Sequence, residues 1–462
     1  MKILILGAGR VGESVAESLV SEQNDITVID TDPARLAVLQ DKLDLRGVAG
    51  NGVQPSVLEQ AGAADADMLI ACAALDETNL VACKLAHQLF NIPTAIARLR
   101  SPDFLEDPRI HDREGFAVDH VICPEESVMR HIQELIHYPE ALQVLSFSQG
   151  RANLVAVRVM SGSALAGHTL KEFRERMPNV DMRVVGIYRQ GVEIEGKAET
   201  RILQGDEVFV LAEHEKLRQV LVALHKRDRV VQRVMIAGGG RVGLRLARSL
   251  ADGFEVKILE QDKKRCQYLA SQLPDNVLVL AGDAADENLL GDENVGEMDL
   301  FLALTNDDED NIMAAMLAKR MGAQRVMALI NRQAYAEMME GGTIDIALSP
   351  AQTVIGELLT HVRRGDVVAV HSLRRGAAEV IEGVARGDAK TSRLVGRRIA
   401  ELKLPRGVRV GAVIRGQGRE AQVLMPHHDV LIETDDHVVM FVPNKRLVRE
   451  VEKFFQVSAF FF

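Results

Sequence analysis

Residues 7–12 read GAGRVG, and residues 238–243, about 230 positions later, read GGGRVG. In both places a short β-branched run precedes the first glycine and an amphipathic stretch follows the last. Three glycines in this spacing, between a strand and a helix, form the fingerprint of a dinucleotide-binding βαβ unit. The fingerprint is weak by itself, but its context here predicts a Rossmann-type domain in each half of the chain.

The two halves correspond beyond these glycines. DITVID at 25–30 matches EVKILE at 255–260, Gly50-Asn51 matches Gly282-Asp283, and DETN at 76–79 matches DEDN at 308–311. A fixed order of matching motifs at one long period is the signature of an internal repeat. The chain is therefore predicted to be a tandem duplication.

Alternating elements begin each half. In the first half we expect strands at 2–6, 26–30 and 67–72 and helices at 10–21, 33–42 and 78–90. Short β-branched runs that alternate with helices build βαβ units, in which helices cover both faces of a parallel sheet. The predicted fold class is α/β, with a doubly wound parallel sheet in each half.

The pattern changes after about residue 145, and again after about residue 366, to strands separated by turns. The expected strands lie at 155–159, 184–189 and 207–211, and then at 410–415 and 437–442. A small α+β domain, here called C-type, thus follows each Rossmann-type or N-type domain. The predicted boundaries are 1–140 and 229–365 for the N-type domains and 141–228 and 366–456 for the C-type domains, with the charged stretch 225–229 as the seam between the halves.

The composition is typical of a folded protein with several domains and no membrane span. A chain of 462 residues is too long for one core, and 47% hydrophobic with 26% charged residues is typical of folded domains. No apolar run approaches the ~18 residues of a membrane span, and the first residues enter a strand pattern instead of a signal peptide, so we expect a cytoplasmic location without a transmembrane segment. A net charge of -11 argues against a nucleic-acid partner, because binding a phosphate backbone requires a Lys and Arg surplus.

Each glycine of the fingerprint has its own expected role. The first permits a tight turn, the second lets a pyrophosphate approach the backbone, and the last lets the helix pack on the strand. The phosphates would lie at the helix N-terminus, where unpaired N–H groups and the helix dipole favour an anion. The candidate cofactor-binding residues of these loops are Gly7, Ala8, Gly9, Arg10, Val11, Gly12, Gly238, Gly239, Gly240, Arg241, Val242 and Gly243.

An acidic residue ends the second strand of each half, 17 or 18 residues after the last glycine: Asp30 in the first and Glu260 in the second. A carboxylate at this place accepts hydrogen bonds from the adenosine ribose hydroxyls and would repel a 2′-phosphate. NAD(H) is therefore favoured over NADP(H). The alternative is a fold that keeps its glycines for packing and binds no nucleotide, and it has more weight for the second copy because Glu reaches further than Asp.

Further candidates follow from the position of the crevice at the carboxyl ends of the strands. They are Asn51, Ala73 and Ala74 in the first half and Asp283 and Thr305, next to Leu304, in the second. Arg98 and Arg100 lie on or after an expected strand at 94–99, and either guanidinium could hold a phosphate as a forked donor or form a surface ion pair. The second half has Leu329 and Asn331 at these positions, so an arginine that matters would make the sites inequivalent.

Other polar groups receive structural interpretations. Asp76, Glu77, Asp308 and Glu309 are expected to cap helices and compensate their dipoles; Cys72, Cys83, Cys123 and Cys266 are interpreted as reduced thiols, and His427-His428 as surface residues. The apolar tail 459–462 is given no function. Because no His-carboxylate or Lys-Tyr arrangement suited to general acid–base chemistry is evident, we predict no catalytic residues, no metal site and no enzyme.

The order of these motifs resembles the family of regulator-of-potassium-conductance (RCK) domains over nearly the whole chain. The resemblance is carried by GAGRVG at 7–12, Asp30, DETN at 76–79, ARLR at 97–100, GGGRVG at 238–243, Glu260 and DEDN at 308–311, and in the C-type domains by LAG at 165–167, GIYR at 186–189, LVG at 394–396 and GAVIR at 411–415. The N-C-N-C order without membrane spans is similar to that of the regulatory subunits of Trk-type potassium uptake systems.

This resemblance implies a peripheral subunit on the inner face of the plasma (inner) membrane. It implies binding of NAD(H), with ATP or ADP at the same crevices, and gating of a membrane-embedded, potassium-transporting partner of the Trk type. It also implies self-association of chains into a ring, expected to be a homotetramer. Two alternatives stay open: an NAD-dependent oxidoreductase, and an RCK-type ligand-sensing module of another channel or transporter.

Overall fold

The structure is a computed structural model that describes residues 1–20, 24–176, 181–225, 230–339, 342–363, 365–373, 377–416, 418–426 and 429–457. Residues 226–229 of the expected seam, His427-His428 and the apolar tail at 459–462 lie outside the described residues. The chain divides into two compact units, Met1–Val128 with Ser349–Leu358, and Met129–Leu348 with Leu359–Phe462. Each unit is described by itself below.

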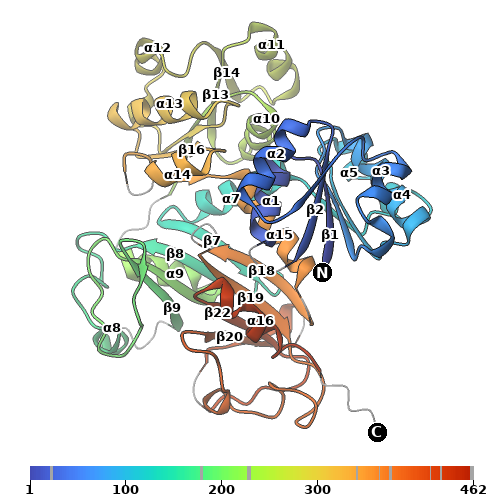
Figure 1. The fold of residues 1–462 in the computed structure, drawn as a ribbon. Helices are drawn as coiled ribbons and strands as arrows, with labels where there is room; N and C mark the ends of the chain where they lie inside the picture. Colours follow the sequence, from blue (N-terminus) through green and yellow to red (C-terminus); the bar gives the residue numbers. More distant parts are fainter. Residues whose placement is uncertain are drawn as a thin grey trace. The chain divides into compact units, whose positions relative to one another are not determined.

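The first unit is built on a parallel sheet with the strand order β3-β2-β1-β4-β5-β6. Strands β1 and β2 of this sheet are labelled in Figure 1. Its strands are β1 (Lys2–Leu6), β2 (Asp25–Asp30), β3 (Arg46–Ala49), β4 (Met68–Ala71), β5 (Thr94–Arg98) and β6 (His120–Ile122). Its helices are α1 (Arg10–Val20), α2 (Pro33–Lys42), α3 (Pro55–Gln60), α4 (Asp76–Phe90), α5 (Pro102–Leu105) and α6 (Pro108–His111). The order reverses between β1 and β4, which is the doubly wound topology that the sequence predicted.

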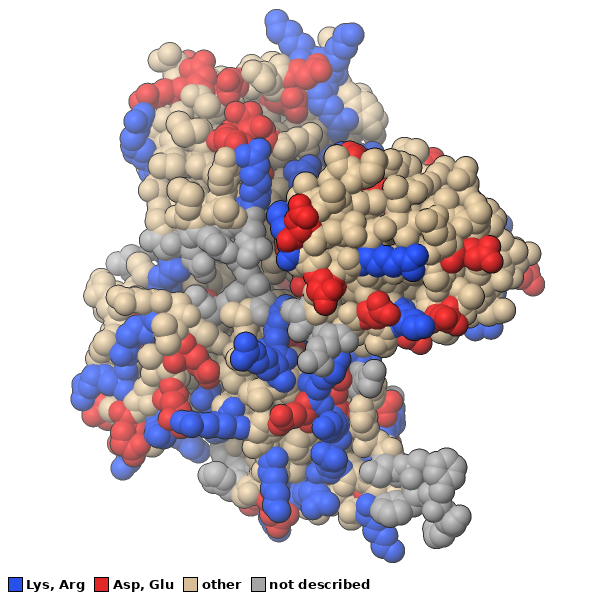
Figure 2. Space-filling model, viewed as in Figure 1, with Lys and Arg blue, Asp and Glu red and all other residues tan. Residues whose placement is uncertain are grey.

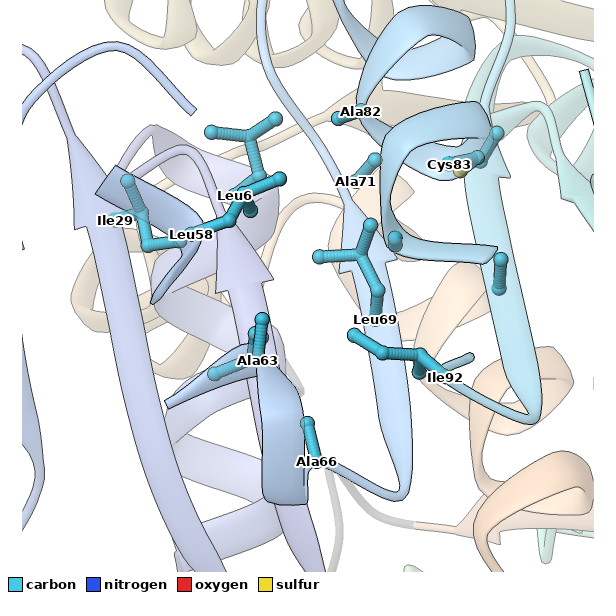
Figure 3. Close-up of a cluster of buried hydrophobic side chains, with 14 of the residues drawn as sticks. Leu6, Ile29, Leu58, Ala63, Ala66, Leu69, Ala71, Ala82, Cys83 and Ile92 are labelled. Carbon is cyan, nitrogen blue, oxygen red and sulfur yellow. The ribbon is translucent and has the colours of Figure 1, made fainter. Parts of the chain in front are cut away.

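The strands of this sheet are apolar on both sides because helices cover both faces. All four residues of β4 are buried, and β1 is buried at every position after Lys2. On one face Leu6 and Leu69 pack with Leu58 of α3 and with small side chains of α4, such as Ala82 (Figure 3). The small residues of α4 allow this helix to lie close to the sheet.

The second unit contains the other N-type domain, whose parallel sheet has the corresponding order β14-β13-β12-β15-β16-β17. Its strands are β12 (Arg233–Ala237), β13 (Glu255–Glu260), β14 (Val277–Ala281), β15 (Leu300–Ala303), β16 (Arg325–Leu329) and β17 (Ile346–Leu348). Its helices are α10 (Arg241–Leu250), α11 (Lys263–Gln272), α12 (Glu287–Asp292), α13 (Asp308–Arg320) and α14 (Gln333–Met339). The duplication inferred from the motifs is thus a duplication of the fold.

Both C-type domains have antiparallel sheets, ordered β10-β9-β11-β8-β7 and β18-β19-β22-β20-β21. The first contains β7 (Ala141–Phe147), β8 (Ala152–Arg158), α8 (Leu170–Arg176), β9 (Met182–Arg189), β10 (Val192–Glu193), β11 (Glu207–Glu213) and α9 (His214–His225). The second contains β18 (Val367–Leu373), β19 (Ala378–Val384), β20 (Arg409–Arg415), β21 (Gln422–Leu424), β22 (His437–Val442) and α16 (Val448–Glu452). Helices α7 (Pro124–His137) and α15 (Pro350–Val362) precede these domains.

The two C-type sheets share one hydrophobic core, in which Phe209 and Leu211 of the first pack with Phe441 of the second. A Cβ on Gly186 would lie 2.9 Å from the Phe441 ring, and one on Gly411 would lie 3.1 Å from Leu211. Each sheet therefore uses a glycine position to admit a large side chain of the other. From here on, the seam is this contact surface between the two C-type domains, as distinct from the charged stretch 225–229 between the halves.

The C-type domains hold strands that were not expected from the sequence, namely β7, β10, β18, β19 and β21. β19 was hidden because it carries Glu379 and Glu382, which are 0% and 2% exposed. Glu379 accepts a hydrogen bond of 2.8 Å from the Arg363 guanidinium, and Glu382 accepts one of 2.6 Å from the Ser148 hydroxyl. Buried carboxylates with such partners break the apolar pattern of a strand without preventing its burial.

The four cysteines are free thiols, and burial raises the pKa of Cys72 to about 12. In the described part of the chain every helix is too short or too polar to cross a lipid bilayer.

Candidate functional site

The first glycine loop folds back onto the end of β4. Gly7 has a φ of +104°, a conformation that favours glycine, and a Cβ there would lie 3.0 Å from the Ala73 nitrogen. A Cβ on Gly12 would lie 1.9 Å from the Gly7 carbonyl oxygen, so α1 can pack on the loop only because this residue has no side chain. In the second loop Gly238 has a φ of +108°, and a Cβ on Gly243 would lie 2.0 Å from the Gly238 oxygen. Both copies build the same turn.

The middle glycines have open space in front of them. A Cβ on Gly9 or on Gly240 would meet no heavy atom within 4 Å. Each precedes the first residue of a helix, Arg10 of α1 or Arg241 of α10, and both arginines are exposed. The next residues, Val11 and Val242, belong to the same first turns. An anion could thus approach the backbone and the positive end of the helix dipole in each copy.

The acidic residues predicted to bind ribose sit beside these loops. The Asp30 carboxylate accepts hydrogen bonds from the backbone nitrogens of Ala8 (2.6 Å) and Asp32 (2.8 Å). The Glu260 carboxylate accepts the corresponding bonds from Gly239 and Asp262, both at 2.9 Å. A carboxylate offers about four acceptor positions, so each retains capacity for ligand hydroxyl groups.

The longer Glu260 fits because its neighbour is smaller. A Cβ on Gly239 would lie 2.3 Å from the Leu269 side chain and 3.0 Å from a Glu260 carboxylate oxygen, whereas Ala8 has room for its methyl group. Ala8 with Asp30 and Gly239 with Glu260 are therefore matched pairs. The sequence analysis took the longer Glu as a reason to doubt the second site, and the structure shows how its extra length is accommodated.

Arg265 is a residue of the second crevice that sequence reasoning missed. Its Nε donates to the Gly239 carbonyl oxygen at 2.6 Å, and its guanidinium lies 4.7 Å from the Tyr268 ring centroid. The corresponding residue of the first copy, Arg35, is exposed and pairs instead with Asp32 at 3.4 Å. The sequence did hold a signal for this residue, because an arginine follows the strand-ending acid by five residues in both copies.

The DETN and DEDN motifs have a structural role that differs from the expected capping. The N-cap residue of α4 is Leu75, without a side-chain cap, and the Asp76 carboxylate instead accepts the backbone N–H groups of Arg100 and Ser101, both at 2.8 Å. Asp308 likewise accepts the backbone N–H groups of Asn331 and Arg332. Both aspartates therefore hold the loop after the fifth strand, and the predicted N-capping was wrong for them. All four acids, Asp76, Glu77, Asp308 and Glu309, do lie in the first turns of α4 and α13, where they compensate the helix dipoles as expected.

The asparagines of these motifs are fully buried and tie two strand ends together. Asn79 accepts from the Ala73 nitrogen at 2.8 Å and donates to the carbonyl oxygens of Ala73 (3.1 Å) and Arg98 (2.8 Å). Asn311 makes the corresponding bonds to Thr305 and Leu329 and also accepts from the Thr305 hydroxyl at 2.7 Å. The strand ends that flank each crevice are thereby fixed.

Of the two candidate arginines, only Arg98 is left with an unsatisfied group. Its Nε is buried with no hydrogen-bond partner among the described residues, and the nearest carboxylate oxygen, of Glu125, is 3.9 Å from Nη2. Burial, and then the neighbouring Arg100, lower the pKa of Arg98. Arg100 itself donates to the Ala74 carbonyl oxygen and faces Asp76. Arg98 is thus the one of these two arginines that keeps an unsatisfied buried donor within the described part of the chain.

The remaining predicted residues lie at the third strand's end, next to the acids. The Gly50 nitrogen donates to the Asp30 carbonyl oxygen, and the Gly282 nitrogen donates to that of Glu260. Asn51 and Asp283, which follow, are exposed and accept from backbone nitrogens two residues further on. Within the described residues no cluster of His, Cys, Asp or Glu has an arrangement that could hold a metal ion.

Comparison with known proteins agrees with this organisation. The model of the TrkA-N domain matches residues 3–124 and 234–350, and that of the TrkA-C domain matches residues 154–225 and 389–456. The fold and the crevices thus define a tandem TrkA-N and TrkA-C protein.

Full-length relatives narrow the class further. The Trk system potassium uptake proteins TrkA of Vibrio alginolyticus and Halomonas elongata are each 50% identical over 462 residues, and that of Haemophilus influenzae is 47% identical, with 100% of both chains covered in every case. The chain belongs to this TrkA family.

Solved structures share the fold. The GsuK channel aligns with a TM-score of 0.62 at 17% identity, covering 98% of this chain and 78% of that one. The GsuK RCK domain aligns with a TM-score of 0.60, also at 17% identity, over 98% of this chain and 94% of that one. The RCK-type fold expected from the motifs is confirmed.

Proposed function

We propose that this chain is the nucleotide-binding regulatory subunit of a Trk-type potassium uptake system. Membership of the TrkA family supports the potassium system. The observation that carries the nucleotide part is present in both copies: open space at Gly9 or Gly240 at a helix N-terminus, beside the carboxylate of Asp30 or Glu260. NAD is also the ligand of one GsuK channel structure, at 18% identity and a TM-score of 0.61.

In this proposal NAD(H) lies across the first crevice. Its pyrophosphate occupies the space at Gly9, the adenosine ribose donates to Asp30, and Arg98 supplies the forked cation. ATP or ADP uses the same loop and acid without a nicotinamide half. The second crevice offers the loop at Gly240 and Glu260, but Leu329 replaces the arginine.

Binding acts on a conformational equilibrium instead of leading to hydride transfer. A nucleotide shifts such an equilibrium only by its difference in affinity between two states, so oxidised, reduced and phosphorylated ligands can have opposite effects at one site. We propose that four chains form a ring on the inner face of the plasma membrane. This ring gates a membrane-embedded potassium-transporting partner. The domains end at the boundaries predicted from the sequence.

An equilibrium titration with NADH tests the nucleotide part. The chain has no Trp, so the cofactor fluorescence can be followed without interference. We expect saturable binding without cofactor consumption, with loss of one site in Gly9→Asp and of any second site in Gly240→Asp. The matched control is Gly253→Asp, because Gly253 is exposed and its Cβ position is equally open.

The NADH titration and a copurification experiment distinguish the proposed function from its alternatives. Unchanged stoichiometry in Gly9→Asp would overturn the first site. Oxidation of NADH in the presence of candidate substrates would favour the oxidoreductase alternative. Copurification with a channel or transporter of another class would favour the other ligand-sensing alternative.

A further inference from the structure

A cavity of about 580 Å³ opens at the seam between the two C-type domains, away from both glycine loops in the sequence. The first domain contributes Glu193, Glu195 and Gly196, and the second contributes Arg406, Gly407, Val408, Arg409, Pro443, Asn444, Arg446 and Leu447. This volume lies within the range of small-molecule pockets, roughly 300 to 1,000 Å³, and exceeds what a bare inorganic ion needs.

The two carboxylates of the cavity are already compensated. The Glu193 carboxylate is 3.6 Å from the Arg409 guanidinium, and the Glu195 carboxylate is 3.0 Å from the Lys197 ammonium group. The hydrogen bond from Lys197, followed by nearby charges that include Arg406 and Arg409, lowers the pKa of Glu195. Burial instead raises the pKa of Glu193, an effect that Arg409 opposes, so each carboxylate of the cavity has its own cation beside it.

The arginines of the cavity are in excess. Arg409 donates to the Val185 carbonyl oxygen at 2.7 Å besides facing Glu193. Among the described residues, the guanidinium groups of Arg406 and Arg446 have no hydrogen-bond or ion-pair partner within bonding distance. A phosphate group would meet two forked donors here.

The surroundings add to this positive charge. Arg183 lies near Arg409, and its pKa is lowered by burial and then by Arg409 and Arg174. Its Nε is buried without a hydrogen-bond partner in the described part of the chain. In Figure 2 Lys and Arg side chains gather over the second C-type domain, where they outnumber Asp and Glu in the sequence 366–456. An anion at the seam would relieve this repulsion.

We propose that the cavity binds a phosphorylated small molecule, a phosphate monoester that carries hydroxyl or amino donors. Arg406 and Arg446 hold its phosphate, Glu195 accepts from its donor groups, and Pro443 with Leu447 forms an apolar wall. Because the lining comes from both C-type domains, the ligand joins them and stabilises the seam. The inference does not depend on the nucleotide crevices.

A tryptophan reporter tests this site locally, because the chain has no Trp of its own. Val192 is 65% exposed and precedes the lining residue Glu193, so Val192→Trp reports on the cavity without filling it. At constant ionic strength, ribose 5-phosphate is titrated, with inorganic phosphate and adenosine 5′-monophosphate as the comparison probes. We expect a saturable fluorescence change, and affinity at least about tenfold weaker in Arg406→Gln/Arg446→Gln.

The control variant is Arg393→Gln, an exposed arginine of the same domain outside the lining, which should bind like the parent. No saturable change with any probe would overturn the proposal, as would equal weakening in Arg393→Gln. A fluorescence change caused only by adenosine 5′-monophosphate and lost in Gly9→Asp or Gly240→Asp would show that Val192→Trp reports on a nucleotide crevice. That result would also overturn the proposal. A higher unfolding temperature with ribose 5-phosphate, absent in the double variant, would support the role at the seam.

Discussion

The two N-type domains keep the same scaffold but differ in the side chains around the proposed phosphate position. In both, a left-handed glycine, a buried asparagine and a strand-ending carboxylate occupy corresponding places. In the first, a buried guanidinium, Arg98, lacks a partner for its Nε, whereas the second has Leu329. In the second, Arg265 donates to the glycine loop, whereas Arg35 of the first is exposed and pairs with Asp32. The shared groups shape the crevice, and the differing groups set its electrostatics.

The largest expected effect concerns the shared scaffold. Gly12→Ala and Gly243→Ala each place a methyl group about 2 Å from a backbone carbonyl oxygen, which cannot move without displacing the turn. Overpacking of this kind should cost about 3 kcal/mol or more in the domain concerned and abolish its nucleotide binding. Thermal unfolding followed by circular dichroism measures the first effect. Gly253→Ala, at an open and exposed position, should stay near the parent; equal stability of all three would refute the packing argument.

Next in size is the loss of the buried asparagines. Asn79→Ala removes three hydrogen bonds, from the Ala73 N–H and to the carbonyl oxygens of Ala73 and Arg98, and should cost about 1 kcal/mol for each and about 3 kcal/mol in total. Asn311→Ala should cost about 0.5 kcal/mol more, because the Thr305 hydroxyl also loses its shorter bond, to Asn311, and keeps only the one of 3.2 Å to the Asp307 carbonyl oxygen. Urea unfolding measures the difference, with exposed Asn288→Ala as the control. A smaller loss in the second copy would contradict the comparison.

The sequence predicted the fold well because its signals are local. The β-branched runs, the helices between them and the glycine turns depend on residues within one βαβ unit, and the structure places their ends within about two residues of expectation. β19 escaped because the buried Glu382 carboxylate accepts a hydrogen bond from Ser148, which is 234 residues away in the sequence. No window of sequence can contain that partner.

The candidate site was predictable to a lesser extent. The glycines and acids are recognised by spacing, but the role of Asp76 depends on N–H groups 24 and 25 residues further on, so a helix cap was the simpler interpretation. Arg98 stood out only as a forked donor, and the sequence could not show that Arg100 is occupied by the Ala74 carbonyl oxygen. Arg265 gave only a spacing signal. Which partner each of these side chains reaches depends on its direction after the strand ends, and the sequence does not give that direction.

Exchanging the arginine sharpens the comparison of the crevices. Arg98→Leu gives the first copy the residue of the second, and we expect its NADH affinity to fall about tenfold to a hundredfold, the effect of losing a charge-assisted hydrogen bond. The stability of the domain should not fall, because burial already disfavours this guanidinium. NADH binding of Arg98→Leu and of its parent is measured in a Gly240→Asp background, so that only the first site is counted.

Arg100→Leu serves as the contrasting variant. It should destabilise the loop that Asp76 holds, since Arg100 also donates to the Ala74 carbonyl oxygen. If Arg98→Leu binds NADH like the parent, the difference between Arg98 and Leu329 does not distinguish the crevices.

The smallest expected effect concerns the matched pairs Ala8 with Asp30 and Gly239 with Glu260. Asp30→Glu alone adds a methylene group beside the Ala8 methyl, so the carboxylate cannot keep its bond to the Ala8 nitrogen, and NADH affinity should fall by about 1 kcal/mol. Ala8→Gly/Asp30→Glu recreates the second copy's pair and should recover most of this loss. A coupling energy of about 0.5 to 1.5 kcal/mol in the double-mutant cycle is expected for such contacts. If the two substitutions change the NADH affinity additively, a Glu at this position does not depend on a glycine in place of Ala8. The compensation inferred from Gly239 and Leu269 would then be wrong.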